Sequence, residues 1–242
     1  MSKTVTILPI LMMVLSCNLK TEKQKDVVEN YMVHIAGAMK NVMWKGKLAG
    51  IIDLDTIQKN PNLYGLGPVE YLKGELLIVD GETYRSTVLS DTSMQVEKTD
   101  QAKAPFFVYG TVKKWRTQRL PGNISNLKQL EYYITEQTLD LAKPFIFRIK
   151  GQVSKAKIHI QNLPDNSVVR SPQEAHVGQQ NYMVAHEEVD IIGFYSNRHQ
   201  GIFTHHDTHM HMHLITADKS KMGHLDDIEF GADTIELLFP AP

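Results

Sequence analysis

The alternating segment from Thr208 to Thr216, Thr-His-Met-His-Met-His-Leu-Ile-Thr, most constrains how this chain folds. Alternate residues of a β-strand point to the same face, so a strand here places His209, His211 and His213 on one face. The methionines and the leucine between them then lie on the opposite face. The pattern therefore predicts a strand with one face able to bind a metal and one face packed in a core.

A third histidine ligand is predicted across a hairpin. His224 follows His213 by eleven residues, and the polar, turn-prone residues 216–223 between them allow the chain to reverse direction. Three protein ligands and one open position are typical of catalytic zinc sites, whereas structural sites usually close their shell with cysteines. We therefore predict that His211, His213 and His224 bind one divalent metal, with Zn2+ favoured and other divalent metals not excluded. A polar strand face without metal is the alternative, but nine of the eleven histidines lie from His176 onward.

The only cysteine has a different predicted role. Lys3 and the apolar run from Val5 to Leu15 are typical of a signal peptide, because the run is too short to cross a hydrocarbon core of about 30 Å. Leu15-Ser16-Cys17 resembles the end of a bacterial lipobox, which predicts cleavage before Cys17 and acylation of that residue. We expect a signal peptide at 1–16, a lipidated tether at 17–26 and an exported bacterial lipoprotein anchored in the cell envelope. A buried structural cysteine after a secretory signal is the alternative.

Composition limits the class of protein. The 242 residues are 42% hydrophobic, which is enough to bury the core of one large domain or of two closely fused lobes. The formal net charge of −1 provides no basic field for nucleic acid, so nucleic acid is not an expected partner. A homodimer is compatible with the sequence but is not indicated by any pattern in it.

Hydrophobic periodicity predicts an α+β fold, with mostly antiparallel or mixed β-sheet and a few helices. We expect a domain at 27–242, with an N-terminal lobe at about 27–142 and a C-terminal metal-binding lobe at about 143–242. Polar residues 162–188 are predicted to be a long loop joining the lobes and bordering the site. Helices are expected at 28–42, 48–57 and 125–141, the last capped by Ser125; strands are expected at 75–79, 82–89, 105–112, 145–149, 154–160, 190–195, 208–216 and 234–239.

Several segments resemble bacterial acetolactate decarboxylases. Residues 67–85, with Gly-Glu-Leu at 74–76 and Asp-Gly at 80–81, resemble the GTFxxLDGELxxxDGxxYR segment of that family. Residues 147–151 resemble its xRIDG strand. Residues 192–194, 211–213 and 223–224 follow its GTxxGF…HxHFxxxxxxxGGH pattern at the same spacing. The resemblance covers roughly residues 40–240.

The resemblance implies a zinc lyase of acetoin biosynthesis that converts 2-acetolactate to acetoin and CO2. In that family three histidines hold the metal, and a carboxylate at the position of Glu75 lies at the site. A Lewis acid can accept the electron pair released as CO2 leaves, and a nearby acid must then protonate the carbon. We expect Glu75 to be that acid or a metal ligand, although sequence alone favours a solvated charge at a strand start.

Two departures from the family pattern concern the site. His159 stands where the resemblance implies a catalytic arginine, and a neutral imidazole cannot hold a carboxylate with a planar fork. The family also has a C-terminal tail that returns a glutamate to the metal, and we expect that glutamate to be missing here. His209 replaces a glycine of the family and is expected to be an auxiliary ligand or a partner of one.

Three functions remain open. The first is acetolactate decarboxylation at an altered site, with a small hydroxy-keto acid as substrate. The second is a related metal-dependent lyase or isomerase acting on another small hydroxy-keto acid. The third is a non-catalytic metal-binding lipoprotein, which strand alternation disfavours because it points the methionines away from the histidines.

Overall fold

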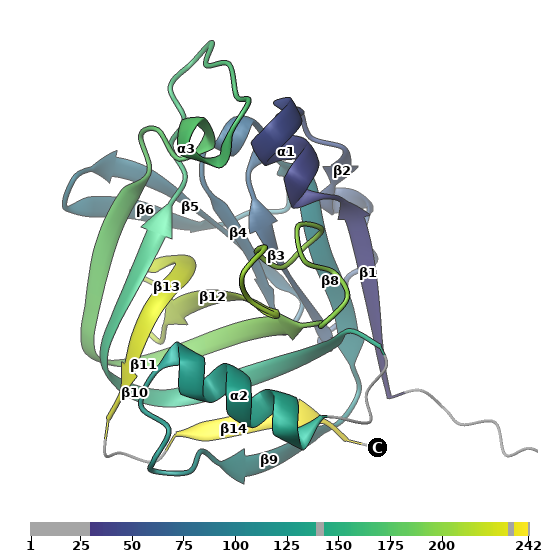
Figure 1. The fold of residues 1–242 in the computed structure, drawn as a ribbon, viewed down its shortest axis with the longest axis vertical. Helices are drawn as coiled ribbons and strands as arrows, with labels where there is room; N and C mark the ends of the chain where they lie inside the picture. Colours follow the sequence, from purple (N-terminus) through teal and green to yellow (C-terminus); the bar gives the residue numbers. More distant parts are fainter. Residues whose placement is uncertain (1–29, 139–142, 232–234, 242) are drawn as a thin grey trace, which may run out of the picture.

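A computed structural model describes residues 30–138, 143–231 and 235–241. Two six-stranded antiparallel sheets form the body of the fold (Figure 1). The first sheet has the order β1-β8-β3-β4-β5-β6, and the second has the order β11-β12-β13-β10-β14-β9. This confirms the predicted α+β class dominated by antiparallel sheet.

The first sheet is built from the N-terminal part of the chain. Its strands are β1 (Tyr31–Gly37), β3 (Leu63–Pro68), β4 (Glu75–Val79), β5 (Glu82–Ser90), β6 (Ser93–Lys98) and β8 (Phe106–Val112). The short strands β2 (Ile52–Asp53) and β7 (Lys103–Ala104) pair separately. The predicted hairpin at Asp80-Gly81 is confirmed, because β4 and β5 pair directly across it.

The second sheet carries the histidine strand. Its strands are β9 (Trp115–Arg119), β10 (Phe145–Ile160), β11 (Gln180–Tyr195), β12 (Met210–Thr216), β13 (Met222–Phe230) and β14 (Glu236–Pro240). The 16-residue strand β10 pairs with both β11 and β13, so β10, β11, β12 and β13 close into a ring of strands. This closure places the end of β10 beside the predicted hairpin of β12 and β13.

The sheets pack face to face. Side chains of both sheets share one apolar cluster, in which Leu66 and Leu77 of the first sheet meet Ile192 and Phe194 of the second. The other face of the second sheet packs on helix α2 (Leu127–Gln137), which lies across it in Figure 1. Helices α1 (Met39–Lys45) and α3 (Pro172–Ala175) cover one end of the sheets, and two short 3-10 helices lie at Leu54–Thr56 and Glu70–Leu72.

Tight packing inside the second sheet requires a glycine on β11. A Cβ atom at Gly193 would lie 2.1 Å from Cζ of Phe147 on the neighbouring strand β10. No real Cβ contact is that short, and the ring of Phe147 is fully buried and cannot move aside. The aromatic ring therefore occupies the space that any other residue at 193 would need.

A partly buried ion-pair network joins the two sheets. Arg148 on β10 donates two hydrogen bonds to Asp190 on β11, at 2.8 and 2.6 Å, and two more to Asp80 at the β4–β5 turn, at 2.9 and 2.8 Å. The hydroxyl of Tyr64 also donates to Asp80 at 2.7 Å, and burial together with that carboxylate raises the pKa of Tyr64 to about 12. The network fixes the first sheet against the second near its turn.

Several secondary-structure elements predicted from the sequence are wrong. Residues 28–42 were expected to form a helix, but the described part forms β1 and α1, because Tyr31, Val33 and Ile35 alternate as a strand paired with β8. The helix expected at 48–57 is instead β2 and a 3-10 helix. The loop expected at 162–188 is shorter, since α3 lies within it and β11 begins at Gln180.

Helix α2 also begins one residue later than expected. Its N-cap is Asn126, whose side chain accepts the backbone N–H of Gln129 at 3.0 Å, and not Ser125. Ser125 instead bonds to the side chain of Gln129. No helix in the described ranges is long and apolar enough to cross a membrane.

Candidate metal centre

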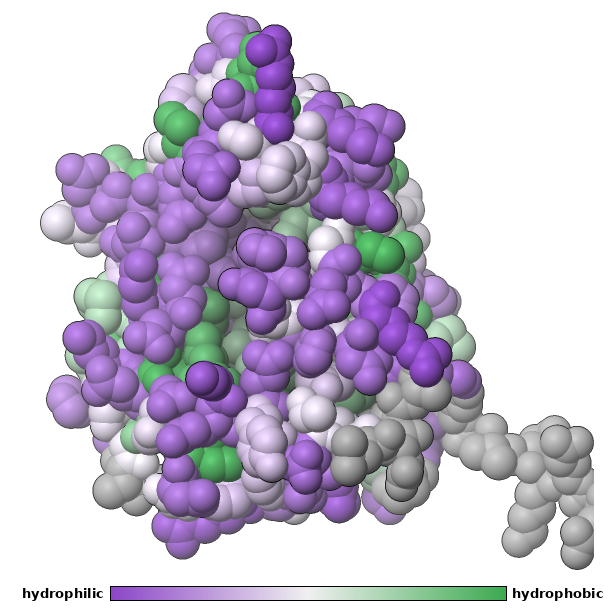
Figure 2. Space-filling view, viewed as in Figure 1, coloured by the Kyte–Doolittle hydropathy of each residue, from purple (hydrophilic) through white to green (hydrophobic). Residues whose placement is uncertain are grey.

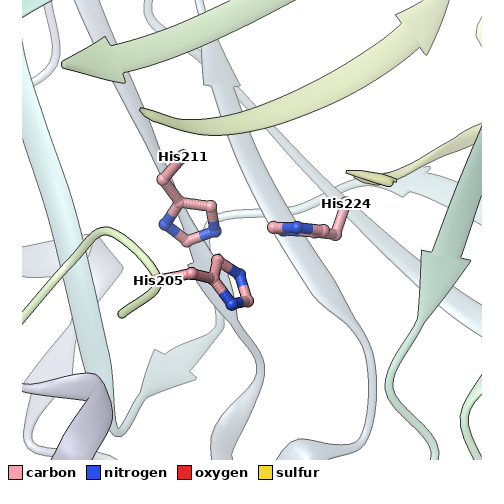
Figure 3. Close-up of side chains that lie close together, drawn as sticks. All are labelled: His205, His211 and His224. Carbon is pink, nitrogen blue, oxygen red and sulfur yellow. The ribbon is translucent and has the colours of Figure 1, made fainter. Parts of the chain in front are cut away.

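Histidines from three segments converge beside the second sheet (Figure 3). His211 lies on β12, His224 lies on β13, and His205 comes from the loop that joins β11 to β12. One ring nitrogen of each lies within 4.8 Å of the others. The strand and hairpin predicted for His211 and His224 therefore bring these two together, while His205 was missed because no periodicity marks a loop residue.

The third predicted ligand, His213, is adjacent to this group. It pairs directly with His224 across the hairpin, and its ring centroid lies 5.2 Å from that of His211 and 5.5 Å from that of His224. Its Nε2 atom points toward the first sheet, where it lies 3.6 Å from Oε2 of Glu75. The donor atoms that lie within 4.8 Å of one another are those of His205, His211 and His224, with His213 beside them, so the predicted ligand set of His211, His213 and His224 stays a prediction.

The histidine nitrogens are buried and available as lone-pair donors. His211 and His213 are 3% and 0% exposed. Among the described residues no hydrogen bond of good geometry reaches Nδ1 of His211 or either ring nitrogen of His213, although the backbone of Phe203 lies near His211 and that of Leu76 near His213. Burial and neighbouring histidines lower the pKa of His213 to about 3 and that of His205 to about 4. The same causes hold the pKa values of His211 and His224 well below the usual value of histidine. Neutral imidazoles that leave buried nitrogens unsatisfied fit a metal ion, because the ion would supply the missing partner.

Glu75 lies against the cluster from the first sheet. It begins β4, is 3% exposed, and accepts the backbone N–H of Gln161 at 3.2 Å. Burial raises the pKa of Glu75 well above its usual value, and the charge of Asp226 adds to this effect, while the bond from Gln161 opposes it. The carboxyl group is therefore held close to the histidines in an environment that favours its protonated form.

His159 lies on the other side of His224. The two are directly paired between β10 and β13, with ring centroids 4.6 Å apart. Nδ1 of His159 lies 2.7 Å from Oδ1 of Asp226, a residue that the sequence did not single out. Ligand atoms of His159, His224 and Asp226 lie within 4.8 Å of one another, so Asp226 orients the imidazole at the edge of the histidine cluster.

His209 lies away from the cluster. Its backbone N–H donates to Oε1 of Glu131 on α2 at 2.8 Å, and its ring nitrogen Nδ1 lies 3.3 Å from the same oxygen. The strand β12 begins one residue later, at Met210. The expected grouping of His209 with His211 and His213 on one strand face is therefore wrong, because Glu131 holds this residue in the preceding loop.

A small cavity and a larger outer groove meet at the histidines. The cavity has a volume of about 20 Å³ and is lined by Glu75, His159, His176, His205, His211 and His224 among others. The groove has a volume of about 760 Å³ and lies between α2 and the residues His205, His209, His224 and Asp226. Most of the surface on the face in Figure 2 is hydrophilic, with apolar side chains in its hollows and at a few places on its outer edge.

The cavity and the groove differ in volume and therefore suit occupants of different size. A cavity of about 20 Å³ has room for one ion or water molecule, since a water needs roughly 10–15 Å³. A substrate would approach from the groove. The remaining predicted site residue, Cys17, lies outside the described residues.

Neutral buried histidines, a protonatable buried carboxyl group and an adjoining groove together define a candidate metal-dependent enzyme centre. The chain belongs to the alpha-acetolactate decarboxylase family, whose profile matches residues 35–238. It is thus a carbon–carbon lyase of the carboxy-lyase type, as the sequence resemblance implied. A search of curated proteins found no match.

Solved structures share the fold. An alpha-acetolactate decarboxylase from Bacillus subtilis strain 168 is similar with a TM-score of 0.68 and 21% identity, over 87% of this chain and 86% of that chain. A Staphylococcus aureus protein of unknown function, similar to alpha-acetolactate decarboxylase, has a TM-score of 0.71 and 17% identity, over 86% of this chain and 84% of that chain. At these identities the likeness concerns the fold.

Proposed function

We propose that this protein decarboxylates 2-acetolactate to acetoin and CO2 with the help of a divalent metal, most simply Zn2+, held by His211, His213 and His224. The family supports the reaction, and the buried, unpartnered histidine nitrogens support the metal. The unsatisfied nitrogens of His211 and His213, next to the donor atom of His224, are the observation that carries the proposal. When bound, the metal would supply a Lewis acid for the electron pair that CO2 leaves behind.

Glu75 is the residue we assign to proton transfer. Cleavage of the bond to the carboxylate leaves an enediolate, which needs one proton on carbon to become acetoin. The raised pKa of Glu75 keeps a proton on its carboxyl group, and its position against His213 places that proton at the site. A positioned acid of this kind contributes roughly 10²–10⁴-fold to a rate.

His159 is assigned to the substrate carboxylate. The contact with Asp226 at Nδ1 fixes the ring, so Nε2 lies on the side of the cavity and of Gln161. Because Nδ1 donates to Asp226, Nε2 can donate to a carboxylate only when the ring is doubly protonated. It then makes one contact where an arginine makes two, which predicts weaker binding of the carboxylate than in relatives with arginine.

A related lyase or isomerase reaction on another small hydroxy-keto acid is the second candidate. It is favoured by one observation, the His159–Asp226 pair in place of a guanidinium. Assays with 2-acetolactate and with hydroxy-keto acids of different chain length separate the two, because a retuned site would turn over another member of the series faster.

We also propose that the mature protein is membrane-anchored through acylated Cys17. The apolar run ending at Leu15-Ser16-Cys17 supports this location. Two acyl chains or one chain with a further signal are needed for stable anchoring.

The metal assignment is tested by elemental analysis. We expect about one metal ion per chain in the purified protein, and we expect it to be lost in the His211→Ala, His224→Ala double variant. Full metal content in that folded variant would contradict the ligand assignment.

A further inference from the structure

We propose that His205 is a fourth metal ligand, so that the centre holds its ion with four imidazoles before substrate binds. This inference rests on the metal site of the proposed function and adds a residue to it. His205 lies on the loop between β11 and β12 and, in Figure 3, its ring points at those of His211 and His224.

The distances between His205 and the neighbouring histidines favour a role as metal ligand. The ring centroid of His205 lies 5.0 Å from that of His224 and 5.9 Å from that of His211, and the three donor atoms lie within 4.8 Å of one another. Bound nitrogens at about 2.0–2.1 Å from a tetrahedral ion are about 3.3 Å apart. Shifts of about an ångström, within reach of side-chain rotation, would therefore bring these donors to one ion.

The loop that carries His205 is fastened on its N-terminal side. Phe203 and Thr204 are fully buried, and the backbone carbonyls of Gly201 and Ile202 accept the N–H groups of Lys40 and Met39 at 2.8 and 2.7 Å. These bonds tie the loop to the start of α1. His205 is therefore presented by anchored backbone and loses little freedom when it binds.

The loop is also fastened on its C-terminal side. The hydroxyl of Thr208 and the backbone N–H of His209 donate to the two carboxylate oxygens of Glu131 on α2, at 2.9 and 2.8 Å. Between the two anchors His206 is exposed, whereas the ring of His205 turns inward. Two neighbouring histidines on one fastened loop thus have opposite environments.

His205 also stands between the small cavity and the outer groove, because it lines both. Four imidazoles would complete a tetrahedral shell, whereas catalytic zinc sites keep a position open. A substrate entering from the groove would therefore displace His205 or expand the shell. In this arrangement His205 protects the resting ion from other ligands.

The experiment compares cobalt-substituted wild-type protein with His205→Ala and His205→Gln, and uses His206→Ala as the matched control. Visible absorption of Co2+ reports coordination number and geometry, and competition with a chelator gives the affinity for Zn2+. Circular dichroism checks that each variant is folded. None of these readouts depends on turnover.

We expect His205→Ala and His205→Gln to lower the affinity for Zn2+ by at least roughly 10–100-fold. A loss of that size already follows removal of a residue that only orients a metal ligand, so removal of a ligand should cost no less. We also expect their Co2+ spectra to change, because a water oxygen replaces an imidazole nitrogen at the ion, while His206→Ala matches wild type. An unchanged Co2+ spectrum and affinity in folded His205→Ala would overturn the inference and leave the three-histidine site intact. Absence of metal binding in wild type itself would instead defeat the proposed function.

Discussion

Removal of the Arg148 guanidinium should destabilise the protein more than removal of any exposed arginine. The Arg148 side chain is 6% exposed, and its partners Asp190 and Asp80 are 13% and 49% exposed. Arg148→Met keeps an unbranched side chain of similar length. The nearly buried carboxylate of Asp190 then has no counter-charge. Breaking a buried pair in this way costs about 3–5 kcal/mol.

The lower end of that range applies here, because half-exposed Asp80 can be solvated after the change. A loss of about 3 kcal/mol in the free energy of unfolding lowers the melting temperature of a chain this size by roughly 6–12 °C, at about 2–4 °C per kcal/mol. Thermal and urea denaturation of the metal-free protein measure both quantities. Replacing Asp190 with Asn in the same variant should recover part of the loss, because it removes the unpaired charge.

Arg85→Met is the matched control. Arg85 also pairs with a carboxylate, that of Glu97, but the two side chains are 32% and 36% exposed. Such pairs contribute about 0–1 kcal/mol. A loss below about 1 kcal/mol in Arg148→Met, equal to that of the control, would refute the claim that this network fixes the two sheets together.

The same network predicts a pH dependence. Burial raises the pKa of Asp80, but the hydrogen bonds from Arg148 and Tyr64 outweigh it and hold the pKa below its usual value. A carboxylate with a lowered pKa binds fewer protons in the folded state, so its stabilising contribution is complete above about pH 4, near its unfolded pKa. The contribution is lost as pH falls through the folded pKa, and the stability gap between wild type and Arg148→Met should narrow there.

Three further predictions concern the site, the core and the N-terminus. Glu75→Gln should retain the fold and most of the metal but lower turnover by about 10²-fold or more, and unchanged turnover would exclude Glu75 as the acid. Gly193→Ala should cost about 1–3 kcal/mol, because its Cβ meets Phe147 at 2.1 Å, whereas Gly122→Ala, with no atom within 4 Å, should be near neutral in urea denaturation. Mass spectrometry of the native protein should show a chain beginning at acylated Cys17, and an uncleaved Met1 would contradict the anchor.

The sequence predicted the histidine hairpin because strand alternation and a polar turn are local properties. His211, His213 and His224 needed only one strand, one turn and the next strand to come together. The β4–β5 hairpin was predictable for the same reason, through Asp80-Gly81. Local patterns therefore predicted that these histidines come together.

The features that the sequence did not predict depend on pairing between strands that are far apart in the sequence. The three- and four-residue spacing around Tyr31 and Ile35 fits a helix, yet the same residues also alternate, and pairing with β8 selects the strand. His205 and Asp226 enter the site only through the anchors of a loop and the pairing of β13 with β10. Neither contact leaves a periodic signal in the sequence.

The measurement that tests the central claim most directly is acetoin production from 2-acetolactate by the purified, Zn2+-loaded protein. We expect acetoin and CO2 in equal amounts from wild type, and none above background from the His211→Ala, His224→Ala double variant. His159→Arg should raise the rate, since a guanidinium holds the substrate carboxylate with two bonds. Absence of acetoin from both wild type and His159→Arg, with metal bound stoichiometrically, would contradict the decarboxylase assignment and favour the related lyase.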